Sequence, residues 1–297
     1  MSTGPNLSAD RGSRFGIGFF RLLLTLCGLH AAVAFAWVVT WFYAHFDRAA
    51  FLAAAPYLKL RFPADAASER ALKRHFHKLI HRLARVMIVS YRIGCGKALV
   101  LEERGSENIP AAGGLVVALA HHGCWQAVME ILNLKGDRPI NIMARPDRHG
   151  KLDKFTALGG SKRGFNLIST EGFSGGLVEA SAALNRGEVV IVMADRAVEG
   201  SPKLEAEYLK GTIELPLSPW LLAAQNRVQV LPVLTDFAEK PLRAVIRYYP
   251  PLAVETPADR RVRAADLAPA AAAYAKILEA AALEAPYSVF RFGNEKN

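Results

Sequence analysis

Residues 115–134 hold the feature that most restricts the fold of this chain. They begin with the apolar run LVVALA, pass through His121, His122 and Gly123, and continue into an amphipathic pattern that carries Gln126 and Glu130. A buried strand that runs directly into a helix is the repeating unit of α/β sheets. In such a sheet, His121 would lie at the carboxyl end of a strand, where open α/β folds bind their ligands.

The chain beyond Gly96 repeats this alternation of strand and helix patterns. Strands are expected at 98–102, 115–120, 140–144, 189–193, 228–234 and 242–249, and helices at 173–185, 217–226 and 264–284. Prolines and glycines separate these segments. The pattern predicts one α/β domain over residues 96–297, with a mixed, largely parallel central sheet flanked by helices.

Residues 22–43 form an apolar run without a formal charge. About 20 apolar residues are enough to cross a bilayer. The run is longer than the apolar region of a signal peptide, roughly 7–15 residues, and no small-residue cleavage site follows Tyr43. We therefore expect a membrane anchor helix over residues 15–46, either spanning the membrane or lying in its interface, after a disordered tail at 1–14.

Residues 47–95 are expected to form a basic helical lead-in to the α/β domain. The pattern predicts a short surface helix at 47–63 that Pro56 interrupts, and a longer helix at 68–93 that Ser68 caps. One face of the longer helix is apolar, and the other is basic: Lys73, Arg74, Lys78, Arg82 and Arg85. That basic face is either solvated or held against anionic lipid, where each cation contributes about 1 kcal/mol.

The charge balance bears on possible partners. A formal charge of +10 in a chain that is 52% hydrophobic indicates an anionic membrane surface or an acidic carrier protein before it indicates nucleic acid. The sequence has no recognisable nucleic-acid-binding module. The three cysteines are far apart, and no motif for a metal, nucleotide or redox cofactor is present, so none is expected.

Charged residues follow two further predicted strands. Arg145 comes after the strand at 140–144, and Asp195 and Arg196 come after the strand at 189–193. Because the carboxyl ends of parallel strands share one edge of a sheet, these residues and His121 are expected to form a cationic crevice with one candidate general base.

Five segments carry a resemblance to a known family. They are AHHGCWQ (120–126), NIMARPDR (141–148), SKRGFNLIS (161–169), GEVVIVMADR (187–196) and EYLKGTIELP (207–216). In this order they resemble the lysophospholipid acyltransferase superfamily, closest to the lipid A biosynthesis lauroyl/myristoyl acyltransferases. The resemblance covers roughly residues 15–293 and implies an amino-terminal membrane helix, a basic helical lead-in and acyl transfer to a lipid.

The family's defining motif is a histidine, four residues and then an acid. The histidine, which acts as general base on the acceptor, maps to His121, and the acid position is occupied by Gln126. A glutamine oxygen can accept a hydrogen bond from the ring but cannot offset its developing positive charge. Glu130, one helical turn further on, and Asp195 are the candidates for the missing carboxylate. His122 is a second candidate base, and a supporting role suits it better.

The resemblance also implies roles for residues outside the motif. Arg145 and Arg163 match basic positions near the phosphates of donor and acceptor, and Asn166 is a candidate hydrogen-bond donor to phosphate. Asp195 and Arg196 are expected to shape the site through an ion pair. Gly211 matches a loop that borders the acyl pocket. The apolar residues 215–222 either line an acyl groove or pack in the core.

Together these features predict a membrane-anchored acyltransferase. The donor would be an acyl carrier protein or coenzyme A thioester, and the acceptor a hydroxyl or amine of a membrane lipid, with direct transfer and no cofactor. The catalytic domain is expected on the cytoplasmic side of the inner membrane, because basic residues follow the anchor. A catalytically silent protein that binds lipid or acyl thioester is the alternative that Gln126 leaves open.

Overall fold

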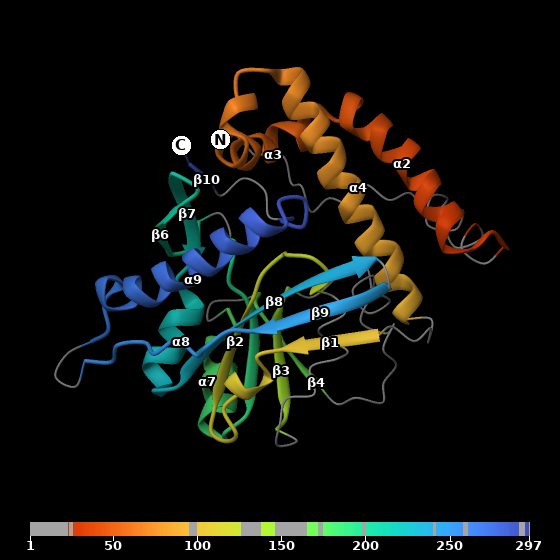
Figure 1. Cartoon of the computed structure of the whole chain (residues 1–297). Helices are drawn as coiled ribbons and strands as arrows, with labels where there is room; N and C mark the ends of the chain where they lie inside the picture. The colour runs from red at the N-terminus through yellow and green to blue at the C-terminus, as the bar shows by residue number, and fades with distance from the viewer. Residues whose placement is uncertain are drawn as a thin grey trace.

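A seven-stranded sheet forms the centre of the protein in the computed structural model (Figure 1). Its strands are β1 (Val100–Arg104), β2 (Leu115–Leu119), β3 (Ile140–Ala144), β4 (Phe165–Ser169), β5 (Val189–Met193), β8 (Gln229–Glu239) and β9 (Leu242–Tyr248). They lie in the order β1-β9-β8-β2-β5-β3-β4, and β8–β9 is the antiparallel pair among parallel ones. The predicted mixed, largely parallel sheet is confirmed. The structure describes residues 23, 26–94, 100–125, 138–145, 165–171, 175–197, 200–239, 242–257, 261–290 and 295–296.

The central strands are apolar on both faces because both faces are buried. In β2, Val116 and Ala118 belong to the larger core, while Leu115, Val117 and Leu119 belong to a second core on the opposite face. All five residues are at most 1% exposed. This double burial explains why β2 and β5 read as continuous apolar runs, without the alternation of a half-exposed strand.

The helices that pack against the larger core include α7 (Leu177–Asn185), α8 (Ser218–Asn226) and α9 (Ala264–Glu284). Trp220 of α8 and Tyr274 of α9 are fully buried against each other, with ring centroids 5.5 Å apart. The Tyr274 hydroxyl donates a hydrogen bond to the Leu119 carbonyl at 2.9 Å. This bond ties α9 to the end of β2, two residues before His121.

A second sheet was not predicted. It consists of β6 (Lys203–Tyr208), β7 (Gly211–Pro216) and the short β10 (Glu295–Lys296). The sequence of β6 does alternate, and Leu204, Ala206 and Tyr208 are its buried residues. The hairpin turn, however, consists of Leu209 and Lys210, both at positive φ, where glycine or asparagine would be the usual signal. β4 was also not predicted as a strand.

Among the described residues, three helices precede the sheet: α2 (Gly28–Phe46), α3 (Arg48–Arg61) and α4 (Glu69–Gly94). Short 3-10 turns lie at η1 (Pro63–Asp65) and η2 (Ser106–Asn108). The Ser68 hydroxyl accepts a hydrogen bond from the Ala71 amide, as its predicted capping role requires. The predicted interruption at Pro56 is wrong, because α3 continues through it. Burial of Tyr57 and Leu58, both 0% exposed, outweighs the backbone hydrogen bond that a proline removes.

Two predicted helix and strand boundaries are also corrected. The helix expected at 173–185 begins at Leu177, since Gly175 and Gly176 before it have positive φ. The strand expected at 228–234 extends to Glu239, because the hairpin with β9 pairs Val233 through Glu239.

Arg227 occupies a backbone conformation that favours glycine. It follows α8 at φ +51° and ψ +43°, and the next amide, of Val228, donates to the Ala223 carbonyl in a helix-ending turn. The Arg227 side chain is exposed.

We expect Arg227→Gly to raise the free energy of unfolding by about 0.5–1 kcal/mol, because an L side chain is strained in this region. Chemical denaturation followed by circular dichroism measures it. Arg227→Ala is the matched control, since it removes the same charge without relieving the strain, and an equal gain in both variants would contradict this explanation.

Candidate active site

The pairing of β2 with β5 sets the positions of His121 and Asp195. These parallel strands are in register, with Leu119 opposite Met193. One alanine follows each strand, and the Ala194 amide extends the pairing by donating to the Leu119 carbonyl at 2.8 Å. His121 and Asp195 are therefore each the second residue beyond a matched pair, and they leave the sheet at the same height.

Asp195 binds His121 through both carboxylate oxygens. Its Oδ1 lies 2.9 Å from His121 Nδ1, and its Oδ2 accepts from the His121 backbone amide at 2.9 Å. The Asp195 side chain is 1% exposed and that of His121 is 21% exposed. Because an ionised carboxylate can only accept, Nδ1 carries the proton and Nε2 presents its lone pair. In its neutral form the ring is thus held in the tautomer that leaves Nε2 unprotonated, with the carboxylate on the opposite side of the ring.

This geometry bears on the carboxylate that the sequence left open between Glu130 and Asp195. Asp195 contacts the ring directly. Glu130 and Gln126 lie outside the described residues, as does Arg163. The Asp195 carboxylate is bound to His121, and the Arg196 side chain is exposed. The ion pair expected between Asp195 and Arg196 stays a prediction.

The turn at residues 121–123, here called the histidine turn, requires glycine at its third position. Gly123 has φ +56°, and a Cβ atom added there would lie 2.0 Å from the Thr235 carbonyl oxygen. The close approach brings the turn against β8. Thr235 is buried, and its hydroxyl donates to the His122 carbonyl at 2.8 Å.

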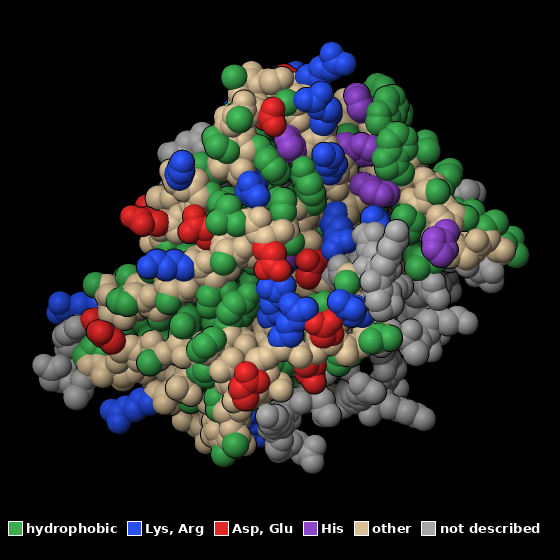
Figure 2. Space-filling view, viewed as in Figure 1, with side chains coloured by type: hydrophobic (Ala, Val, Ile, Leu, Met, Phe, Trp, Pro, Cys, Tyr) green, Lys and Arg blue, Asp and Glu red, His purple; other side chains and the backbone are tan. Residues whose placement is uncertain are grey.

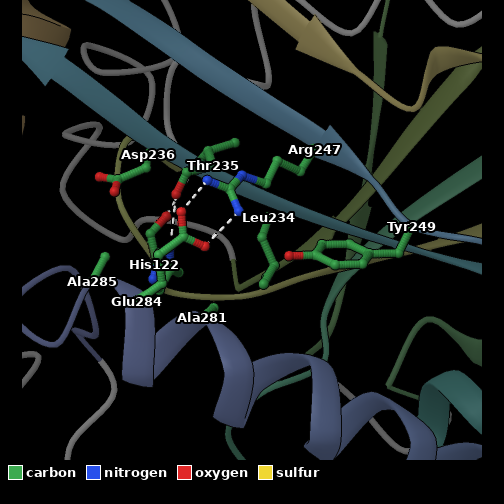
Figure 3. A pocket seen from close by; sticks show the side chains of 9 residues that line it. All are labelled: His122, Leu234, Thr235, Asp236, Arg247, Tyr249, Ala281, Glu284 and Ala285. Carbon is green, nitrogen blue, oxygen red and sulfur yellow. Dashed lines mark hydrogen bonds and ion pairs between the residues drawn. The ribbon is translucent and has the colours of Figure 1, made fainter.

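His122 is buried within the structure and differs from His121 in its surroundings. It is 7% exposed, and its Nδ1 lies 2.7 Å from the Thr235 carbonyl oxygen. Figure 3 shows the small cavity beside it, of about 20 Å³, bounded by the end of α9 and by the Arg247–Glu284 ion pair. That pair holds the pKa of Glu284 below its usual range. The cavity has room for about one water, so it is too small for a lipid or a thioester. These contacts favour a supporting role for His122 over a role as general base or in substrate binding.

Apolar side chains border His121 on the side of α4. The Trp125 ring lies edge-on to the His121 ring, with centroids 5.4 Å apart, and 5.9 Å from Phe290. Val86 and Val89 of α4 belong to the same cluster, as does Cys124, which is 0% exposed. A fully buried thiol is poorly placed to attack a substrate, so the geometry gives no support to Cys124 as a nucleophile.

Arg145 is at the same edge of the sheet as His121. It follows β3, which pairs in parallel with β5, and its side chain is exposed. With Arg196 it supplies positive charge at the carboxyl ends of the strands. Three residues of the expected cationic crevice, His121, Arg145 and Arg196, therefore lie at one edge of the sheet, and Asp195 is buried beside His121.

Asn166 is not brought to this edge. Asn166 is near the start of β4, where its amide donates to the Asn141 side chain, and Asn141 in turn donates to Glu188. By strand register it lies level with Val116, roughly 16 Å along the strands from His121. Gly211 begins β7 in the small sheet. We therefore do not assign Asn166 to the site.

The run at 215–222 packs mainly in the core. Leu215, Trp220 and Leu222 are each 0% exposed and belong to the larger hydrophobic cluster. Of the two interpretations that the sequence allowed, core packing fits these residues. Among the described residues, no group of three or more His, Cys, Asp or Glu side chains is arranged to hold a metal ion.

Sequence reasoning missed the residues that hold the histidine turn from other parts of the chain. Thr235 lies in the interior of β8, and residues 286–290 follow the last helix. No local pattern marks either as part of a site, because both contact the turn largely through backbone groups and across more than 100 residues.

Gly123→Ala should disrupt the histidine turn more than a positive φ alone explains. We expect a loss of about 2–4 kcal/mol in the free energy of unfolding, from strain plus the clash with Thr235. Gly113→Ala is the matched control, because Gly113 has φ +83° and nothing lies within 4 Å of its added Cβ. That variant should lose only about 1 kcal/mol. Denaturant titrations of both variants give the comparison, and equal losses would show that the approach to Thr235 is not tight.

Comparison with known proteins places the chain in a family. No curated protein matches it. Among solved structures it is similar to the 1-acyl-sn-glycerophosphate (LPA) acyltransferase PlsC from Thermotoga maritima, at 16% identity and a TM-score of 0.37, covering 84% of this chain and 96% of that chain. A TM-score this low carries no argument about function. The model of the bacterial lipid A biosynthesis acyltransferases matches residues 11–291, confirming the resemblance inferred from the motifs and indicating acyltransferase activity in lipid biosynthesis. The chain therefore belongs to the bacterial lipid A biosynthesis acyltransferase family.

Proposed function

We propose that this protein is a membrane-associated enzyme that transfers a fatty acyl group from a thioester to a lipid acceptor, with His121 as general base. The donor is an acyl carrier protein or coenzyme A thioester, and the acceptor group is a hydroxyl or an amine. The observation that carries the proposal is the two-oxygen contact between buried Asp195 and the turn-borne, partly exposed His121.

The reaction follows from the orientation of the ring. The acceptor oxygen or nitrogen attacks the thioester carbonyl carbon while its proton passes to His121 Nε2. The tetrahedral intermediate then collapses, the carbon–sulfur bond breaks, and the imidazolium returns the proton to the leaving thiolate. Attack is direct, since the neighbouring Cys124 is buried and no acyl-enzyme is required.

Asp195 supplies the negative charge that Gln126 lacks. In the transition state the ring becomes positively charged, and a carboxylate that is hydrogen-bonded to Nδ1 stabilises that charge while fixing the tautomer. Burial of Asp195 strengthens the effect, because the pair lies away from water. This arrangement favours an active enzyme over a silent lipid-binding protein.

Arg145 and Arg196 are proposed to bind anionic parts of the substrates. Both are exposed at the edge of the sheet that carries His121. A guanidinium can bind phosphate through two parallel hydrogen bonds. Phosphate occurs in the phosphopantetheine arm of either donor and in many lipid headgroups.

Acyl transfer by purified protein tests the catalytic assignment. His121→Ala should abolish the acylated lipid formed from labelled acyl carrier protein or acyl-CoA and extracted membrane lipids. Asp195→Asn should lower kcat by up to about 10⁴-fold, the loss seen when the carboxylate beside a histidine base is replaced by its amide. Gln126→Glu should stay within a few-fold of the native rate, because Asp195 already provides the charge. Full activity in His121→Ala, or no turnover by the native protein with either donor, would reject the assignment.

The membrane association is proposed to involve α2. Among the described residues, one helix, Gly28–Phe46, is long and apolar enough to cross a bilayer. Its small residues Ala32 and Ala36 pack on α4, while its aromatic residues are exposed. The exposed set comprises Phe35, Trp37, Val38, Trp41, Phe42, Tyr43 and Phe46. Figure 2 shows this apolar face at the upper right, with histidines between it and the Lys and Arg side chains nearer the centre.

We propose that α2 lies in the membrane interface and does not span the bilayer. Its 19 residues would cover about 28 Å, enough to cross, but α4 runs alongside it. Trp37 contacts His77, and Ala32 and Ala36 cluster with Ile88, so residues 77–88 of α4 accompany α2. A spanning α2 would carry the cations of that stretch, Lys78, Arg82 and Arg85, into hydrocarbon. Each costs about 2.5–3.5 kcal/mol at the bilayer centre.

The interface placement also suits the residues between the helices. The His77 ring lies against Trp37, and burial lowers the pKa of His77, so this ring is neutral at pH 7. An uncharged His77 beneath α2 allows the apolar face to enter the acyl region, while the exposed Lys78 remains at headgroup level.

Labelling from one side of the membrane distinguishes the two placements. Cys27, exposed just before α2, and a cysteine introduced by His45→Cys near its end would be tested in separate variants that lack the other cysteines. In inside-out membrane vesicles, both should react with an impermeant maleimide, because both ends of an interfacial helix face the cytoplasm. If only one position reacts before the vesicles are opened, α2 spans the membrane.

A further inference from the structure

The chain segment after α9 lies directly against the histidine turn. We call residues 286–290 the strap. The Phe290 amide donates to the His121 carbonyl at 2.7 Å, and the Gly123 amide donates to the Ser288 carbonyl at 2.8 Å. Between these two bonds, His122 and Val289 form an antiparallel bridge. The backbone on both sides of His122 is therefore fixed by the strap.

The strap is also fastened to the helical lead-in. The hydroxyl of fully buried Tyr57, in α3, donates to the Pro286 carbonyl at 2.7 Å. The Tyr287 hydroxyl lies 2.8 Å from Nδ1 of His75 in α4, and the other nitrogen of that ring lies 2.9 Å from Asp65. α3 and α4 thus hold the amino-terminal half of the strap.

Arg82 joins α4 to both the strap and β8. Its Nη2 donates to Asp236 Oδ1 at 2.9 Å, and the Ser288 hydroxyl donates to the same oxygen at 3.0 Å. The Arg82 and Asp236 side chains are 18% and 26% exposed. Asp236 follows Thr235, whose backbone and hydroxyl bind His122. In Figure 3 Thr235 and Asp236 lie beside His122, with Ala285, the residue before the strap, close by.

We propose that Arg82 is a positioning residue: through Asp236 and Ser288 it holds the strap, and the strap holds the histidine turn in its reactive geometry. Arg82 itself does not need to touch substrate. This inference rests on the proposed role of His121 as base. Its consequence is that α4, the helix that packs beside α2, helps to set the alignment of the catalytic histidine.

The bonds from Asp195 fix the ring and the amide of His121, while the strap fixes its carbonyl and the two residues after it. Without Arg82, this ion pair to Asp236 would be lost, and Ser288 would be held less firmly. A shift of about 1 Å in a reacting group can cost 10²-fold in rate, even when binding is unchanged.

The test compares Arg82→Gln with a matched change on the same helix. Arg74→Gln removes the same charge at an exposed position of α4. Arg82→Gln should lower kcat by about 10–100-fold with KM within a few-fold of native, as expected when orientation is lost and binding kept. Arg82→Lys should restore part of the rate, because the cation returns, and Arg74→Gln should remain near native. Steady-state kinetics with the acyl thioester donor give kcat and KM for the native protein and the three variants.

Ser288→Ala provides a second, milder probe if Arg82→Gln folds poorly by circular dichroism. It removes one hydrogen bond to Asp236 and should lower kcat by about 3–10-fold with KM unchanged. In the double variant the two losses should be less than multiplicative, because both act through Asp236. Multiplicative losses, or a Ser288→Ala variant with native kcat, would overturn the proposal.

The outcomes separate this inference from the proposed function. If His121→Ala remains active in the same assay, the general-base assignment fails and the strap has no catalytic turn to position. If His121→Ala is inactive while Arg82→Gln matches Arg74→Gln in kcat, the base assignment stands and the positioning role of Arg82 is wrong. A loss confined to KM would also reject positioning, since it would indicate a role in binding.

Discussion

The parallel pairing of β2 with β5 is the interaction on which the site depends. It places Leu119 opposite Met193, so that His121 and Asp195 emerge together at the edge of the sheet. A register shift of one residue would turn one of the two side chains to the other face of the sheet. The register is secured by two buried cores, one on each face, because a slip of one residue would exchange the side chains packed into the two cores. Hydrophobic packing on both sides of the sheet therefore fixes the distance between an imidazole and a carboxylate.

The source of the carboxylate distinguishes this chain from the motif that identifies its family. The motif places an acid on the same turn of chain as the histidine, and this chain has Gln126 there. The carboxylate that contacts His121 belongs instead to a neighbouring strand. An acid on a central strand is held by the sheet, so its orientation does not depend on the first turn of the following helix. Our interpretation is that the charge required by the reaction is retained although the motif acid is absent.

α4 connects the proposed membrane-facing region to the proposed catalytic region. One face of it packs against α2, Val86 and Val89 join the apolar cluster beside His121, and Arg82 reaches Asp236 and the strap. The same amphipathic helix can therefore hold the protein at a lipid surface and support the histidine turn. The basic residues of α4 do not all share one environment. Arg82 faces the catalytic domain, and Arg74 and Lys78 are exposed.

The sequence by itself determined the α/β class, the positions of β2, β3 and β5 and the presence of His121 at a strand end, because each follows from local periodicity and burial. It also offered Asp195 as one of two carboxylate candidates. Only the tertiary structure decided that Asp195 contacts His121, that Asn166 lies at the other end of its strand, and that Thr235 and the strap hold the histidine turn. Those outcomes depend on strand order and on backbone contacts between segments more than 100 residues apart. A sequence pattern predicts which residues are buried, but it does not predict which residues they contact in the folded protein.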